Sequence, residues 1–158
     1  MVSKGDRLNL NFPTEALRAG KRWQGEFADL LEGPTVVSVY MRNNTSSCDK
    51  QVASLVESSK AIRKLGYNLV VVSKDTLNSH CKYAEEQEAS YTFVSDKEHL
   101  FGKAADSILE KKMYGKVFLG PSRSAYLLDA EGEVLDVIEK VEPACHGAQV
   151  VEAIKSLS

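Results

Sequence analysis

The residue with the clearest chemical potential is Cys48, which follows an apolar run and a short polar loop. The run Val36-Val37-Ser38-Val39-Tyr40 is typical of a strand buried on both faces, and a helix is predicted to start at residues 45–49. Cys48 therefore lies in the first turn of a helix, just past the carboxyl end of a strand, where open α/β sheets place reactive groups. Free backbone N–H groups and the positive end of the helix dipole favour a thiolate there.

A thiolate in this position is a nucleophile. Against a hydroperoxide it attacks one oxygen, expels the other as water or an alcohol, and becomes a sulfenic acid. Thr45 precedes Cys48 by three residues, so its hydroxyl is expected to face the same pocket and either orient the peroxide or cap the helix. The charge of Asp49 opposes the thiolate, so a cation is needed. Arg42 is near in sequence, and Arg123 stands at the start of a later strand.

The competing interpretation is that the cysteines are inert. A lone cysteine at a strand-to-helix junction is a weak signal, because free cysteines are often small buried hydrophobes. That alternative applies to Cys48, Cys81 and Cys145 alike. His80, His99 and His146 show no metal-like spacing with each other or with the cysteines. No metal or organic cofactor is expected.

Alternating strands and helices are predicted to position this junction. Strands are expected at residues 36–40, 69–72, 91–94, 124–129 and 134–138, and helices at 45–65, 75–88, 97–106 and 146–157. Residues 1–33 are mixed, with a turn at Gly20-Lys21 and packing anchors at Trp23 and Phe27. Ser46 and Asp49 have the spacing of a capping box, and residues 107–122 are predicted to be irregular. This order predicts one α/β domain over residues 1–158, with a central mixed sheet and helices on both faces.

Composition narrows the class of function. The chain has 158 residues and a net charge of -2, which gives no electrostatic reason to expect nucleic acid or an acidic membrane surface as a partner. No secretory signal or membrane-spanning stretch is recognisable. Three cysteines, an odd number, argue against a disulfide framework and for reduced thiols in the cytoplasm.

Several stretches resemble the peroxiredoxins. Residues 40–48, Tyr-Met-Arg-Asn-Asn-Thr-Ser-Ser-Cys, look like their active-site motif Pro-x-x-x-Thr-x-x-Cys. Residues 73–80, 111–116, 122–124 and 141–143 match, in order, the branch called peroxiredoxin Q or bacterioferritin comigratory protein. The resemblance spans about residues 34–157. It implies a thioredoxin-like fold and a thiol peroxidase for hydrogen peroxide and small organic hydroperoxides.

By this resemblance, Cys48 is the peroxidatic cysteine, while Thr45 and Arg123 hold the peroxide and stabilise the developing charge. The chain departs from the family pattern at five positions, which are Met41 for the motif proline, Ser46-Ser47 for Pro-Gly, Asp49 for Thr and Gln51 for Glu. These departures leave an alternative open, in which the chain is a weak or inactive redox sensor or interaction module with the same fold.

The resemblance also bears on how the sulfenic acid is reduced. Many members of the branch carry a second cysteine five residues after the first, but here that residue is Ala53. Others carry it in the next helix, so Cys81 is expected to resolve and thioredoxin or a similar dithiol to recycle the enzyme. Cys145 and a one-cysteine mechanism remain alternatives. A monomer is expected from the habit of the branch, and Lys111, Lys112 and Lys116 are interpreted as a solvated loop or a contact for the reductase.

Overall fold

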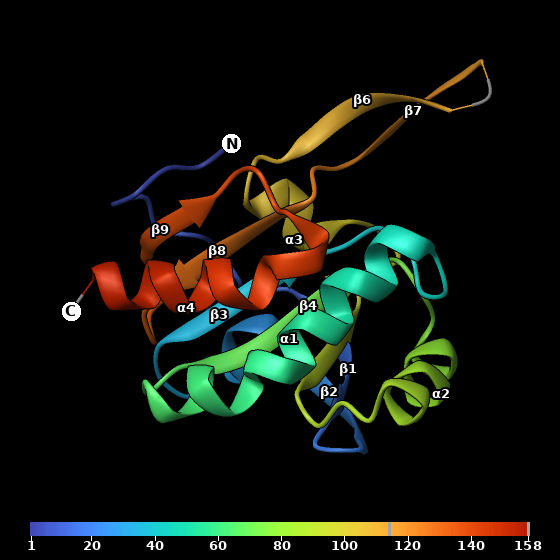
Figure 1. Ribbon diagram of the computed structural model, residues 1–158. Coiled ribbons are helices and arrows are strands. Elements are labelled where there is room, and N and C mark those ends of the chain that lie inside the picture. The colour runs from blue at the N-terminus through green and yellow to red at the C-terminus, as the bar shows by residue number, and fades with distance from the viewer. Residues whose placement is uncertain (114, 158) are drawn as a thin grey trace.

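A seven-stranded mixed sheet forms the centre of the molecule, in the strand order β2-β1-β5-β4-β3-β8-β9 (Figure 1). The computed structural model describes residues 1–113 and 115–157, without the side chains of residues 111–113 and 118. The sheet strands are β1 (Pro13–Arg18), β2 (Lys21–Glu26), β3 (Thr35–Val39), β4 (Asn68–Ser73), β5 (Thr92–Ser95), β8 (Ser124–Leu128) and β9 (Val134–Ile138). The helices are α1 (Ser46–Lys64), α2 (Leu77–Gln87), α3 (Leu100–Ala104) and α4 (His146–Ser156), with 3₁₀ turns η1 (Phe27–Leu30) and η2 (Pro143–Cys145).

The three central strands set the direction of the sheet. β3 pairs in parallel with β4, and β4 in parallel with β5, whereas β8 runs antiparallel to β3. Parallel neighbours need crossover connections, and α1 and α2 provide them. The carboxyl ends of β3 and β4 therefore lie at one edge, next to the amino end of β8. The predicted α/β class, with a mixed central sheet, is confirmed.

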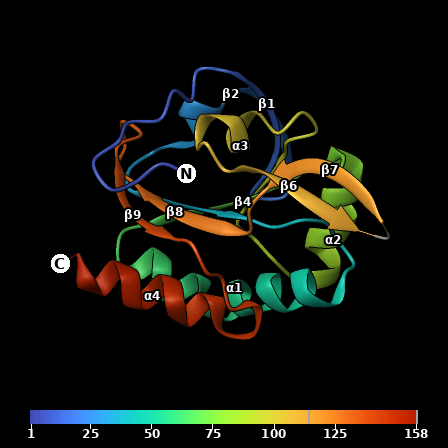
Figure 2. The ribbon, with the colours of Figure 1, turned by 90° about the horizontal axis from the view of Figure 1, so that it is seen from above.

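Helices cover both faces of this sheet. α1 and α4 lie together on one face and α3 lies on the other (Figure 2). Alternate residues of β3 point to opposite faces, as the period of a strand requires. Val37 and Val39 belong to the core cluster under α3, and Val36 to the cluster under α1 and α4. The strand is buried on both faces, which explains its continuous apolar run.

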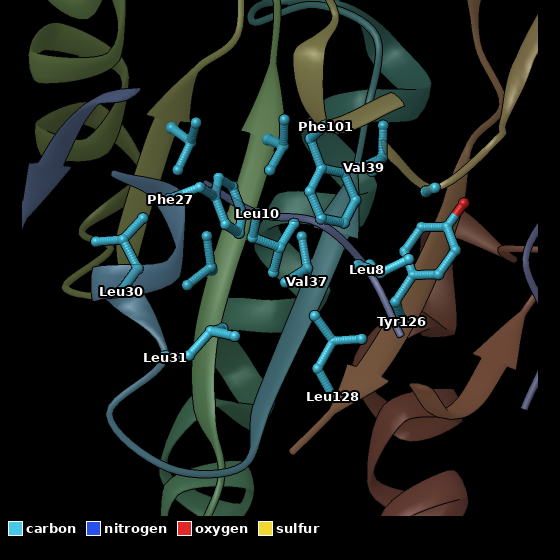
Figure 3. Packing of buried hydrophobic residues seen from close by; sticks show 14 of the residues in the cluster. Leu8, Leu10, Phe27, Leu30, Leu31, Val37, Val39, Phe101, Tyr126 and Leu128 are labelled. Carbon is cyan, nitrogen blue, oxygen red and sulfur yellow. The ribbon is translucent and has the colours of Figure 1, made fainter. Parts of the chain in front are cut away.

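The core cluster under α3 is rich in aromatic rings (Figure 3). Phe27 is fully buried, with its ring centroid 5.0 Å from that of Phe101 and 5.5 Å from that of Phe12. Trp23 is partly buried against the same cluster. The predicted packing role of Phe27 and Trp23 is confirmed, and so is the turn at Gly20, whose φ of +78° favours glycine.

The prediction of irregular structure over residues 107–122 is wrong. This segment forms a two-stranded antiparallel ribbon of β6 (Ile108–Met113) and β7 (Lys116–Pro121), which pairs only with itself and projects from the body (Figure 1). Most of the ribbon's described side chains are exposed, so its sequence lacks the alternation that marks a half-buried strand. Leu109, Val117 and Leu119 on it are exposed. The predicted helix over residues 97–106 is also shorter, since Asp96 accepts hydrogen bonds from the backbone N–H groups of Leu100 and Phe101 and fixes its start there.

Within the described range, no helix is both long enough and apolar enough to span a lipid bilayer.

The aromatic packing yields a stability prediction. Phe27→Ala should lower the free energy of unfolding by about 3–5 kcal/mol, because the ring is fully buried between two others. Leu109→Ala, at a side chain that is 50% exposed on the ribbon, should change it by less than about 0.5 kcal/mol. Urea denaturation followed by circular dichroism measures both. Equal losses in the two variants would contradict this description of the core.

Candidate active site

Cys48 lies deep in a pocket at the carboxyl ends of β3 and β4. It occupies the first turn of α1, three residues after the N-cap residue Thr45. The residue is only 1% exposed and packs in the cluster under α1 and α4. It nevertheless lines a pocket of about 730 Å³, to which Thr45 and Arg123 also contribute.

Arg123 reaches the sulfur from a distant part of the chain. It directly precedes β8, whose first residue Ser124 lies opposite Val39 in the antiparallel pair with β3. The residue before β8 therefore emerges beside the start of α1. Arg123 Nη2 donates a hydrogen bond to Cys48 Sγ over 3.4 Å, which brings a positive charge next to the sulfur. Arg42, the other candidate cation, also lines the pocket, but its side chain is exposed.

A second hydrogen bond fixes the guanidinium of Arg123. Its Nη1 donates to Gln51 Oε1 over 3.2 Å. Gln51 lies three residues after Cys48, so both side chains stand on one face of α1. Gln51 is fully buried, and its Nε2 donates to the carbonyl of Val39 over 3.2 Å. A carbonyl can only accept, so the amide nitrogen faces the strand and the amide oxygen faces Arg123. This role of Gln51 was not predicted, although its spacing from Cys48 was the signal.

The hydroxyl of Thr45 already donates its one proton to the backbone. Thr45 Oγ1 donates to the carbonyl of Arg42 over 2.9 Å and makes no side-chain cap of α1. A hydroxyl has one proton and two lone pairs. With its proton used, Thr45 can accept a hydrogen bond from a molecule in the pocket but cannot donate one. Of the two roles considered for it, orienting a ligand fits this geometry and capping the helix does not.

The loop before Cys48 is anchored by Asn43, which is buried. Its backbone N–H donates to Asp75 Oδ2 over 2.9 Å, and its side-chain Nδ2 donates to Ser79 Oγ over 3.0 Å. The hydroxyl of Tyr40 donates to Asn43 Oδ1. Residues at the start of α2 thus hold the loop that carries Thr45. This explains why the stretch 73–80 matters to the site although it lies far from Cys48 in sequence.

Comparison with known proteins identifies the family. Residues 11–137 match the sequence profile of the AhpC/TSA family. The chain belongs to the AhpC/TSA family. It is 33% identical over 121 residues to Peroxiredoxin Bcp of Xanthomonas campestris, with 77% of this chain and 76% of that protein covered, and 28% identical over 123 residues to Peroxiredoxin Bcp of Bacillus subtilis, with 78% of each covered.

Solved structures agree with this assignment. The bacterioferritin comigratory protein of Xanthomonas campestris, described in terms of its alkyl peroxide reduction activity, superposes with a TM-score of 0.83 at 28% identity, covering 96% of this chain and 98% of that one. The chain is therefore a peroxiredoxin of the Bcp, or Q, branch, with the thioredoxin-like fold of that branch. The expected resemblance is confirmed.

Asp49, one of this peroxiredoxin's departures from the family motif, has a carboxylate that is bonded to a residue of α2. Its Oδ1 accepts a hydrogen bond from the hydroxyl of Tyr83 in α2 over 2.5 Å. Burial, and next the bond to Asp49, raise the pKa of Tyr83 well above its ordinary value, so the phenol remains a donor. The predicted capping box of Ser46 and Asp49 is wrong. Thr45 is the N-cap residue, and the carboxylate of Asp49 accepts a hydrogen bond from α2 instead of capping α1.

Met41 stands where other peroxiredoxins carry the motif proline. It is half-buried, packs against both core clusters and lines the pocket. Val39, Val72, Leu119 and Pro121 line the pocket as well. The pocket lining therefore includes several apolar side chains, called here the apolar wall, and the substituted residue is one of them. Ser46 and Ser47, the other changed positions, are exposed at the start of α1.

The other two cysteines differ in their surroundings. Cys81 is half-buried in α2 and packs against the cluster that contains Cys48. Cys145 is exposed at the N-cap of α4. All three cysteines are free. Cys81 thus shares a core cluster with the candidate nucleophile, whereas Cys145 does not.

Other candidate sites receive no support. Among the described residues, no group of three or more His, Cys, Asp or Glu side chains could hold a metal ion. The Lys111 and Lys112 side chains and Tyr114, from the stretch 111–116 that resembles the family, lie outside the described residues. Lys116 is exposed at the start of β7.

Two buried histidines give the protein a defined response to acid. His80 and His146 are fully buried. Burial lowers the pKa of each to about 4. For His80 the charge of Asp75 and the bond to Val94 act against burial. For His146 the bond to Gln149 acts against it and the charge of Arg123 adds to it. Both imidazoles are therefore neutral at neutral pH.

Stability should fall as pH is lowered from about 6.5 to about 4. In that window the unfolded chain binds protons at His80 and His146 and the folded chain does not, so the free energy of unfolding falls as pH falls. Each histidine contributes up to about 1.4 kcal/mol per pH unit. Urea titrations at several pH values on the parent, His80→Gln, His146→Gln and the double variant measure the slope. The double variant should show the flattest slope, and a slope equal to the parent's would contradict the assignment.

Proposed function

We propose that this peroxiredoxin reduces hydrogen peroxide and small organic hydroperoxides, with Cys48 as the nucleophile. The observation that carries the proposal is the 3.4 Å contact between Arg123 Nη2 and Cys48 Sγ in a pocket also lined by Thr45. A guanidinium on the sulfur favours the thiolate, and the pocket admits a ligand beside both. Membership of the family supports the same chemistry.

The reaction uses these groups in defined roles. The thiolate of Cys48 attacks the terminal oxygen of the hydroperoxide, an S–O bond forms, the O–O bond breaks, and the leaving oxygen takes up a proton to become water or an alcohol. The cysteine becomes a sulfenic acid. Thr45 accepts a hydrogen bond from the O–H group of the peroxide, since its own proton is donated to Arg42. Arg123 stabilises the negative charge that develops on the oxygens.

The pocket explains why organic hydroperoxides are included. Its apolar wall of Met41, Val72, Leu119 and Pro121 suits the alkyl part of such a substrate, while the O–O bond lies near Cys48. The alkyl peroxide reduction activity named for the Xanthomonas campestris relative supports this substrate class.

For the second half of the cycle we propose Cys81 as the resolving cysteine. Its thiolate attacks the sulfenic sulfur of Cys48, a disulfide forms, and hydroxide leaves as water after taking up a proton. Both cysteines lie within helices, and Cys48 is buried. The first turn of α1 and part of α2 must therefore unwind locally for the sulfurs to meet. Thioredoxin or a similar dithiol then reduces the disulfide, in a monomeric protein of the reducing cytoplasm.

A weak or inactive redox sensor was the competing expectation, based on Met41 and Asp49. The arrangement favours the enzyme. The carboxylate of Asp49 accepts a hydrogen bond from Tyr83, and Gln51 still holds Arg123 through its amide oxygen. The pocket beside Cys48 is present with Met41 in its lining. The departures therefore change the partners around the site without removing the contact on which the chemistry depends.

Removing the nucleophile or its cation should abolish the first step. Cys48→Ser should consume no peroxide, and Arg123→Ala should lower the second-order rate constant with hydrogen peroxide by about 100-fold or more, since it removes the preorganised charge. Stopped-flow measurement of peroxide consumption tests both, with Cys145→Ser as the control expected to react at the parent rate. Peroxide consumption by Cys48→Ser at the parent rate would end the proposal.

Removing Cys81 should separate the two half-reactions. Cys81→Ser should form the Cys48 sulfenic acid at a rate close to the parent's, because the pocket is unchanged. It should form no intramolecular disulfide, and steady-state turnover with thioredoxin should fall by at least about tenfold. Mass spectrometry after one equivalent of peroxide distinguishes sulfenic acid from disulfide. A Cys48–Cys145 disulfide in the parent would instead assign resolution to Cys145.

A further inference from the structure

A chain of hydrogen bonds continues behind Arg123 into the core. Gln51 Nε2 donates to Ser38 Oγ over 2.9 Å, and Ser38 Oγ lies 2.8 Å from His146 Nε2. His146 Nδ1 lies 3.2 Å from Gln149 Oε1, and Gln149 Nε2 donates to the carbonyl of Lys140 over 3.0 Å. These residues come from α1, β3, α4 and the segment before α4. The chain thus ties the guanidinium on the sulfur to the backbone between β9 and α4.

The direction of every bond in this chain is determined. Gln149 Oε1 accepts from the backbone N–H of Glu142 over 3.0 Å while its Nε2 donates to a carbonyl, so the atom that faces His146 is an acceptor. His146 therefore carries its proton on Nδ1, and its Nε2 must accept. Ser38 receives the amide proton of Gln51 and passes its own proton to His146 Nε2.

The result is a one-way series of donors. Each group donates to the next, from Arg123 through Gln51, Ser38 and His146 to Gln149. Reversing Ser38 would place two donors against each other at Gln51, whose nitrogen is held by the carbonyl of Val39. In such a series each hydrogen bond polarises the next one in the same direction, and each group fixes the orientation of its neighbour.

The middle of the chain is out of contact with water. Ser38, Gln51 and His146 are each 0% exposed. Burial keeps His146 neutral near neutral pH, with its pKa lowered to about 4. A buried polar group without a partner loses its hydration without compensation, so each member of the series keeps its neighbour in place. Apolar side chains at these positions would fill the same core without this constraint, whereas the observed series ends on the residue that contacts the sulfur.

We propose that Ser38 and His146 are positioning residues for peroxide reduction, acting through Gln51 to hold the guanidinium of Arg123 on the sulfur of Cys48. The inference rests on the proposed function and adds two residues to it that touch neither substrate nor nucleophile. Without the series, the amide of Gln51 loses one of the two acceptors that fix its nitrogen. Its oxygen then no longer holds Arg123 Nη1 in one place.

The test is a set of variants measured by two readouts. Ser38→Ala and His146→Leu interrupt the series, and His146→Gln keeps a side-chain carbonyl that can accept from Ser38. Thr35→Val removes a buried hydroxyl from the other end of β3, where it donates to Gly33, and serves as the matched control. The readouts are the rate constant for Cys48 with hydrogen peroxide by stopped flow, and the rate of alkylation of Cys48 by iodoacetamide in a Cys81→Ser, Cys145→Ser background.

We expect Ser38→Ala and His146→Leu to slow the peroxide reaction by about tenfold, with slower alkylation at neutral pH. His146→Gln should recover most of the rate, and Thr35→Val should match the parent. In an Arg123→Ala background, Ser38→Ala should cause no further loss, because its effect passes through that arginine. A purely structural role would instead slow both backgrounds equally and follow the loss of stability, which urea denaturation measures for each variant.

Two results would overturn the proposal. One is a Ser38→Ala rate equal to the parent's while Arg123→Ala is slow. The other is an equal further loss from Ser38→Ala in the Arg123→Ala background. Failure of the proposed function looks different, since Cys48 would then not react with peroxide in the parent. In that case the rate of alkylation of Cys48 by iodoacetamide would still show whether the series holds the guanidinium on the sulfur.

Discussion

The whole arrangement depends on one contact, between a guanidinium and a sulfur that lie 75 residues apart in the chain. The sulfur is buried in an apolar cluster, at the start of a helix that offers only partial charges. The arginine that directly precedes β8 brings a full positive charge to it. The sheet serves this contact by placing the end of β3 and the beginning of β8 side by side.

The pairing of β3 with β8 places these two groups side by side. Val39 and Ser124 face each other in the antiparallel pair, so the chain enters β8 where it leaves β3. A shift of that register by one residue would turn Arg123 to the other face of the sheet. The buried apolar side chains of both strands forbid such a shift. The packing of the core and the geometry of the site are therefore set by the same pairing.

Much of this could be predicted from the sequence, for identifiable reasons. The apolar run at 36–40 and the helix after it are local patterns, so the place of Cys48 followed directly. Arg123 was named as one of two candidate cations from its place before a strand, and the family resemblance then favoured it, but its contact with the sulfur is visible only in three dimensions. The ribbon of β6 and β7 was missed because most of its described side chains are exposed and impose no alternating pattern. The partner of Asp49 was missed because Tyr83 lies in another helix, and the link from Ser38 to His146 joins residues 108 apart.

The ribbon has a consequence for how this enzyme can vary. Leu119 on β7 forms part of the apolar wall of the pocket, and Arg123 follows it by four residues on the same continuous stretch. With the roles proposed for these two residues, the choice of peroxide and the rate of its cleavage are not independent. An insertion or a tilt in this projecting hairpin would move both residues at once. Changes in this short stretch would therefore alter peroxide selectivity and reactivity together.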